Sequence, residues 1–223
     1  MKVIFATDFY AASVTARALL TRLNWSFGTR LELLHVLPPP RRSGWFGSGG
    51  HGPETLETAR RELRLFGHDL AARVEDARGS VQQTILVGDP ATSILQRALT
   101  IGADLIVIGG PGRAESASRE LSPLSATVAS QAHCSVLIAR TERVEHLLVD
   151  ADPREADEAE DQVARSPLLR SMAVSASRRD VADDDGDVLR ALSGLEGSVL
   201  IWRGPADVPA HMSEMASGGR GRA

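Results

Sequence analysis

Short apolar runs alternate with helical patterns along the first 140 residues, and this alternation restricts the possible folds of the chain. Each run is brief and bounded by turn residues, as expected for a buried strand. Amphipathic helical spacing separates the runs and is clearest at residues 55–75. Because helices usually connect parallel strands, the pattern predicts an α/β fold with a doubly wound, five-stranded parallel sheet. The five predicted strands are residues 2–7, 29–37, 81–87, 104–108 and 134–140.

The composition is that of a globular chain without a basic face. With 223 residues, 43% of them hydrophobic, the chain can bury one sizeable core, or one domain and a smaller unit. The net charge is −4 and the arginines are scattered among acidic residues, so we expect no nucleic-acid partner. No apolar run approaches the roughly 20 residues that span a bilayer. Asp8 interrupts the first run before a signal-peptide core could form, so we expect a cytoplasmic protein without membrane contacts.

Cysteine and histidine are too sparse to suggest a redox or metal centre. Cys134 is the single cysteine, which excludes an intrachain disulfide. Its apolar surroundings predict a small buried hydrophobe and not a nucleophile. His35 lies near the end of a predicted strand, and no second histidine stands at metal-ligand spacing from it, so we expect no metal site.

A glycine-rich turn follows the fourth predicted strand. Gly109, Gly110 and Gly112 surround Pro111 directly after the apolar run 104–108, so the backbone is expected to turn sharply there. Open α/β sheets bind ligands at the carboxyl ends of their parallel strands. The segment therefore predicts a phosphate-binding turn.

The spacing of these glycines resembles that of the universal stress protein family. Two residues separate Gly109 from Gly112 and nine separate Gly112 from Ser122, similar to the family pattern G-x-x-G, nine residues, then G-[S/T]. The segments GDPATSILQRALTIGADLIVIGG and AHCSVLIAR also resemble the family, as do MKVIFATDF and LELLHVL near the N-terminus. The likeness covers about the first 140 residues and implies the strand order 3-2-1-4-5.

The resemblance implies a site for an adenine nucleotide, ATP or AMP, with Mg²⁺ only alongside ATP. In the family, backbone N–H groups at a helix start and a hydroxyl hold the phosphates, a common way to bind anions. Asp8 corresponds to the aspartate that contacts the adenine and ribose, although it could instead cap the following helix. The backbone of Val36 corresponds to a wall of the adenine pocket. The candidate cofactor-binding residues are Asp8, Val36, Gly109, Gly112, Arg113, Ser122 and Ser125.

The phosphate end departs from the family pattern, because Ser122 and Pro123 replace the Gly-Ser or Gly-Thr pair. Proline has no N–H, so one donor and one hydroxyl are lost. Glu115 and Glu120 would each repel a phosphate, which Arg113 and Arg119 could offset. The alternative reading is an ordinary helix opening, with serine as N-cap and proline at the first helical position.

Two further features bear on partners. Residues 38–53 are rich in glycine, proline and serine and include Trp45 and Phe46, so they form either a lid or a floppy insertion. The predicted strand 134–140 is a sheet edge that needs covering or pairing. The resemblance implies that this strand pairs across a homodimer or, in tandem chains, with the second half. We therefore expect a homodimer or an intrachain pseudo-dimer through Cys134 to Arg140.

Residues 141–206 contain a weak internal repeat. HLLVDAD at 146–152 matches KVIFATD at 2–8, and VLRALSGLEGSVLIWRGP echoes ILQRALTIGADLIVIGGP if one residue is gapped. The segment is either a contracted second copy of residues 1–140, without a strand–helix pair and the phosphate loop, or an unrelated α/β extension. Residues 207–223 are expected to be disordered.

Two functions fit these patterns. The first is a stress-response or regulatory module that responds to an adenine nucleotide bound at a degenerate site. The second is a nucleotide-free member that acts through protein–protein interaction and dimerisation. The sequence has no P-loop and no arrangement of nucleophile, base and acid, so we expect no catalytic residues, although enzymatic activity stays open.

Overall fold

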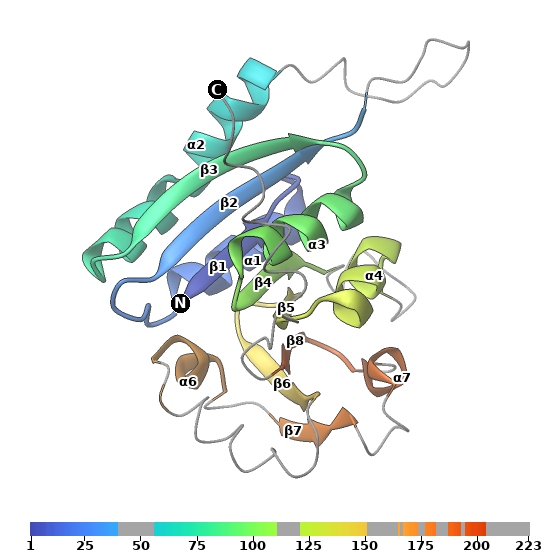
Figure 1. The fold of residues 1–223 in the computed structure, drawn as a ribbon. Coiled ribbons are helices and arrows are strands. Elements are labelled where there is room, and N and C mark those ends of the chain that lie inside the picture. Colours follow the sequence, from blue (N-terminus) through green and yellow to red (C-terminus); the bar gives the residue numbers. More distant parts are fainter. Residues whose placement is uncertain are drawn as a thin grey trace, which may run out of the picture.

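The structure, a computed structural model, describes residues 1–39, 56–110, 121–150, 165, 167–173, 177–181, 187–192 and 195–203. The strands of these residues form one sheet in the order β3-β2-β1-β4-β5-β8-β6-β7 (Figure 1). In chain order they are β1 (Lys2–Ala6), β2 (Arg30–Leu37), β3 (Ser80–Val87), β4 (Leu105–Gly109), β5 (Ser135–Ala139), β6 (Val144–Val149), β7 (Ser177–Asp180) and β8 (Ser198–Trp202).

The first five strands form the parallel sheet that the sequence predicts. β1 pairs with β2 and β4, while β3 and β5 pair outside them, and every pairing is parallel. The order 3-2-1-4-5 confirms the predicted doubly wound topology. The helices between these strands are α1 (Ala11–Thr21), α2 (Leu56–Asp76), α3 (Pro90–Ile101) and α4 (Pro123–Gln131).

Side chains alternate along β1, so each face of the sheet has its own core. Val3 and Phe5 pack with residues of α1 and α2, whereas Ile4 and Ala6 pack with residues of α3 and α4. All four side chains are buried. Figure 1 shows the two pairs of helices on opposite faces of the sheet.

Helix α3 begins and ends at the residues that the sequence marks. The Asp89 carboxylate accepts the Thr92 N–H at 2.9 Å, and Pro90 occupies the first helical position. Gly102 closes the helix in the left-handed region, with φ at 61°. The N-cap at Asp89 and the left-handed Gly102 thus set the two ends of this helix.

The C-terminal strands extend the same sheet. β8 pairs with β5 in the antiparallel sense, and β6 pairs in parallel with β8 on one side and with β7 on the other. The short helices α6 (Pro167–Ala173) and α7 (Val188–Leu192) precede β7 and β8. β5, which the sequence predicts as an edge, is therefore covered by a strand of its own chain.

Arg203 connects the C-terminal strands to the first five strands through hydrogen bonds and an ion pair. Its Nε donates to Asp150 Oδ2 at 2.7 Å, and its Nη2 donates to the carbonyl oxygen of Ala129 in α4 at 2.6 Å. Its backbone N–H donates to Ser135 Oγ, on β5, at 3.0 Å. A single residue thus holds β8 against α4, β5 and the end of β6.

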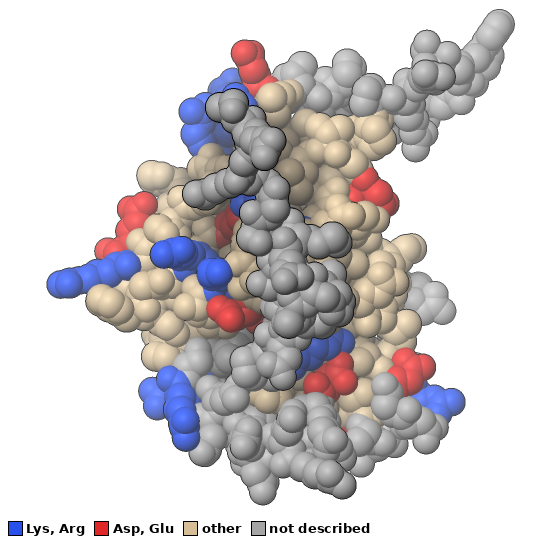
Figure 2. All heavy atoms as spheres, viewed as in Figure 1, with Lys and Arg blue, Asp and Glu red and all other residues tan. Residues whose placement is uncertain are grey.

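Some sequence predictions fall outside the described residues. Among them are Trp45, Phe46 and the C-terminal residues 207–223. No helix within the described ranges is long and apolar enough to cross a bilayer. Figure 2 shows positive and negative side chains interspersed on the described part of one face of the molecule.

Candidate functional site

The carboxyl ends of β2, β1, β4 and β5 bring candidate residues to one level. The register pairs Ala6 with both Leu34 and Ile108. It pairs Ile108 in turn with Ile138. At about 4.8 Å between neighbouring strands, four strands span about 14 Å. Each chain segment continues two residues beyond its paired position, to Val36 near the end of β2, Asp8 after β1, Gly110 after β4 and Arg140 after β5. We call these four residues the carboxyl-end row.

The Asp8 carboxylate is exposed and turns toward the start of α1. Its Oδ1 accepts hydrogen bonds from the Tyr10 N–H at 3.0 Å and from the Ser13 hydroxyl at 2.7 Å. No hydrogen bond from the described residues reaches Oδ2. The N-cap of α1 is Tyr10, without a side-chain cap bond, so Asp8 does not cap the helix as the alternative reading expects. Asp8 instead holds the chain just before α1 and keeps an oxygen that can accept a hydrogen bond from a ligand.

Gly109 is a glycine because α1 approaches it closely. A Cβ atom built on Gly109 would lie 2.5 Å from the carbonyl carbon of Ala12 and 2.8 Å from the backbone nitrogen of Ser13. Both atoms belong to the backbone of the first helical turn, which cannot move aside as a flexible side chain can. Helix packing alone thus accounts for this glycine, whatever else the turn does.

Helix α4 opens as the alternative reading of Ser122 and Pro123 describes. Ser122 Oγ accepts the Ser125 N–H at 3.1 Å and donates to Ser125 Oγ at 2.9 Å. Pro123 occupies the first helical position, and Ser125 is fully buried. The Leu124 N–H has no hydrogen-bond partner in the described part of the chain. The opening turn therefore offers few donors to an anion.

The structure brings most of the predicted cofactor-binding residues to the same end of the sheet. Asp8, Val36 and Gly109 lie at the ends of neighbouring strands. Ser122 lies at this end too, since α4 leads back to the amino end of the parallel strand β5. Gly112 and Arg113 are outside the described residues.

Sequence reasoning missed an aromatic contact beside the row. Phe9 has φ at 67°, a strained value for a bulky residue, and its ring stacks on His35 with 4.5 Å between centroids. His35 Nδ1 lies 2.7 Å from the carbonyl oxygen of Thr7. These contacts fix the chain on either side of Asp8, and no local sequence pattern indicates them.

A groove of about 650 Å³ lies between α3 and α4, close to the first turn of α4. Leu95, Leu99 and Leu124 line it together with polar side chains such as Gln96 and Gln131. No residue of the carboxyl-end row lines this groove. It is therefore a neighbour of the candidate site and not part of it.

Cys134 should resist thiol reagents in the folded protein. It is buried, and desolvation of the thiolate raises the pKa of Cys134 to about 12, against an opposing effect of the nearby Arg203 charge. Because the thiolate is the reactive form, iodoacetamide at mildly alkaline pH should label only protein unfolded in guanidinium chloride. Mass spectrometry checks this, and equal labelling of folded and unfolded protein would contradict it.

Comparison with known protein families agrees with this geometry. The sequence model of the universal stress protein family matches residues 1–140. The chain belongs to the universal stress protein family. No curated protein matches it.

Several solved structures resemble this universal stress protein. A functionally unknown protein from Pseudomonas aeruginosa PAO1 is 14% identical with a TM-score of 0.51, over 97% of this chain and 96% of its own. A universal stress protein from Archaeoglobus fulgidus DSM 4304 is 12% identical with a TM-score of 0.49, over 91% and 98%. An AMP-bound family member from Arabidopsis thaliana is 24% identical with a TM-score of 0.36, over 61% and 88%. At these identities the likeness concerns the fold alone.

Proposed function

We propose that this universal stress protein binds an adenine nucleotide across the carboxyl ends of β2, β1 and β4 and acts as a nucleotide-responsive stress or regulatory module. The carboxyl-end row carries the proposal, because the register sets Val36, Asp8 and Gly110 at one level. Parallel α/β sheets bind ligands at this end. Membership of the family supports an adenine nucleotide over other ligands.

The base and ribose belong at the Val36 side of the row. Val36 is half-buried against the core under α3 and α4, so its neighbourhood is apolar enough for a base. Oδ2 of the exposed Asp8 can accept a ribose hydroxyl while Oδ1 keeps its two protein donors. This half of the site needs no rearrangement of the hydrogen bonds at Asp8.

The phosphates belong at the Gly110 side, near the start of α4. Pro123 lacks an N–H and the Ser125 N–H is already bonded, so this helix start binds an anion less well than a glycine-serine start would. No three histidine, cysteine or acidic side chains of the described residues gather to hold a metal ion. Mg²⁺ is proposed only as a companion of ATP, held by its phosphates.

Calorimetric titration with AMP, and with ATP with and without Mg²⁺, tests the proposal. We expect saturable binding in the micromolar range, about −8 kcal/mol. Asp8→Asn keeps an oxygen for Tyr10 and Ser13 but loses the second acceptor, so it should weaken binding about tenfold, or 1.4 kcal/mol. Asp69→Asn, an equal charge change at an exposed position of α2, is the matched control and should have no effect.

A nucleotide-free role is the second candidate. It is favoured because polar groups at the start of α4 already hydrogen-bond one another. Ser122 and Ser125 form hydrogen bonds with each other, and Pro123 has no backbone N–H that could bind a phosphate. Such a member would act through protein–protein contacts. The absence of any thermal shift at millimolar ATP would reject nucleotide binding and favour this role.

We further propose that the C-terminal strands are a contracted copy of the first domain. The order β7-β6-β8 repeats β2-β1-β4 with the same parallel pairings, and α6 and α7 occupy the places of α1 and α3 in the chain. On this reading the copy lacks counterparts of β3 and β5. The antiparallel pairing of β8 with β5 supports an intrachain pseudo-dimer over a homodimer through β5.

A further inference from the structure

Arg140 ends the carboxyl-end row and lies directly against Gly110. The Gly110 N–H donates to the carbonyl oxygen of Ala139 at 2.8 Å, which holds the end of β4 beside the end of β5. A Cβ atom on Gly110 would lie 2.8 Å from Arg140 Cγ and 3.3 Å from Arg140 Nε. The Arg140 side chain therefore lies beside the first residues of the glycine-rich turn.

Arg140 has hydrogen bonds to the C-terminal strands but no counterion among the described residues. Its Nη1 donates to the carbonyl oxygen of Leu195 at 2.7 Å, and its backbone N–H donates to Ser198 Oγ at 3.0 Å. Its Nε is buried without a hydrogen-bond partner, and no carboxylate of the described residues pairs with it. Burial lowers the pKa of Arg140, as expected for a desolvated cation.

Two other partly buried arginines, Arg97 and Arg203, are neutralised by carboxylates. Arg97 pairs with Glu32 at 2.7 Å, and Arg203 pairs with Asp150 at the same distance. A desolvated guanidinium without an anion is costly, so its presence needs a compensating partner. Arg140 thus combines an unpaired charge with an unused Nε–H at the end of the sheet where ligands bind.

We propose that Arg140 is an anion-binding residue that holds the phosphate of a nucleoside monophosphate at the Gly110 end of the row. The inference rests on the proposed nucleotide site and adds the group that recognises the phosphate. A guanidinium group offers several N–H donors and a full charge, and suits phosphate better than most side chains. It would supply the donors that Pro123 cannot.

Binding of AMP and of adenosine to the full chain tests the inference, since the two ligands differ only in the phosphate. The wild type should bind AMP at least tenfold more tightly than adenosine. Arg140→Gln should remove this preference and leave the affinity for adenosine unchanged. Arg140→Lys keeps the charge but loses the planar group, so it should retain part of the preference.

Arg203→Gln is the matched control, because Arg203 also donates to a backbone carbonyl across the contact between the C-terminal strands and the first five. It should lower the melting temperature and keep the AMP preference. Gly110→Ala is a second test, since its Cβ would displace the Arg140 side chain. It should weaken the binding of AMP and leave the binding of adenosine unchanged.

The outcomes separate the two proposals. If the wild type binds AMP and adenosine and both Arg140→Gln and Gly110→Ala keep the preference for AMP, Arg140 is only a structural tie and this inference is overturned, while the nucleotide site stands. If the wild type binds neither ligand, the nucleotide site itself fails and the role of Arg140 fails with it.

Discussion

Replacing Arg97 with leucine should lower the free energy of unfolding by about 3–5 kcal/mol, the range for breaking a buried ion pair from one side. Arg97 on α3 donates from Nε at 2.7 Å and from Nη2 at 3.0 Å to the two carboxylate oxygens of Glu32 on β2. The Glu32 side chain is only 6% exposed, so the substitution leaves its charge buried and alone. Urea unfolding followed by circular dichroism measures the loss.

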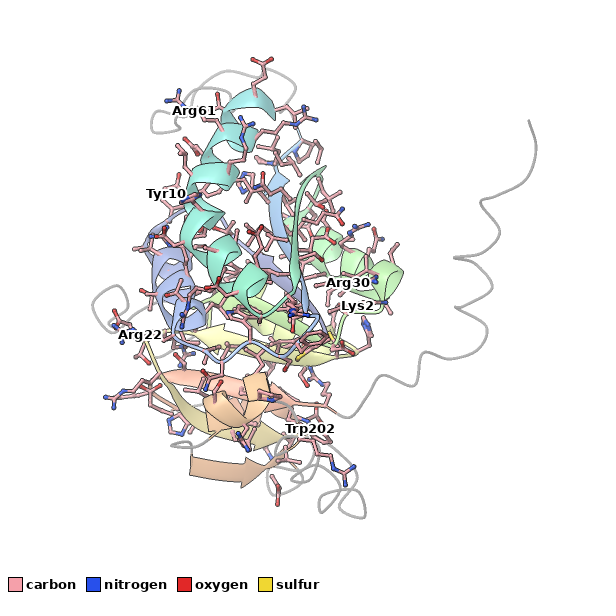
Figure 3. The ribbon with its side chains drawn as sticks, turned by 90° about the vertical axis from the view of Figure 1, so that its left-hand side faces the viewer. Lys2, Tyr10, Arg22, Arg30, Arg61 and Trp202 are labelled. Atoms are coloured by element: carbon pink, nitrogen blue, oxygen red, sulfur yellow. The ribbon has the colours of Figure 1, made fainter. Side chains whose placement is uncertain are left out.

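Two variants make this result interpretable. Arg22→Leu removes an ion pair with Glu142 in which the side chains are 62% and 50% exposed, so it should cost at most about 1 kcal/mol. Figure 3 shows Arg22 at the surface of the molecule. Adding Glu32→Leu to Arg97→Leu should recover most of the loss, because no charge is then left buried. A loss for Arg97→Leu no larger than for Arg22→Leu would show that the buried pair contributes little.

The first five strands and their helices could be predicted from sequence because their signals are local. The observed strands β1 to β5 match the predicted runs within a residue or two. Four of them are largely buried and rich in apolar residues, as parallel strands usually are, whereas β3 lies at the edge of the sheet and has no fully buried residue. Caps sharpen the bounds further, as Asp89 and Gly102 do for α3. The strand order then followed from the family resemblance.

The C-terminal strands were predicted less well because their arrangement depends on long-range pairing. β7 reads SRRD, without an apolar run, and it forms at the outer edge of the sheet beside β6. β8 inserts between β5 and β6 although it comes last in the chain. Nothing within a short window of sequence indicates that insertion.

In the candidate site, too, the features that depend on local sequence could be predicted and those that depend on long-range contacts could not. Asp8 and Val36 lie at the same height on the sheet because β1 and β2 end close to them, and the sequence indicates both strand ends. The reason for Gly109 does not, since it depends on the approach of α1. Arg140 was not a candidate from sequence, because its contacts are with Gly110 and Leu195, which lie far from it in sequence.

Replacing Leu200 with alanine should cost about 2–5 kcal/mol, the usual range for truncating a fully buried leucine. Leu200 is the middle residue of β8, is 0% exposed, and is paired with Leu137 of β5 and Leu147 of β6. The cavity would therefore open where the C-terminal strands join the first five. Trp202, labelled in Figure 3, ends the same strand. Denaturant unfolding measures the cost.

Leu189→Ala is the matched control, because Leu189 lies on α7 in the same part of the chain and is 39% exposed. It should change stability by about 0.5 kcal/mol or less. Loosening of β8 would also expose β5 as an open edge, so Leu200→Ala should associate at high concentration in sedimentation experiments and Leu189→Ala should not. If Leu200→Ala is as stable as Leu189→Ala and stays the same size as the wild type, β8 does not cover β5 in solution. The edge of β5 would then be available for pairing between chains, and the homodimer would replace the intrachain pseudo-dimer.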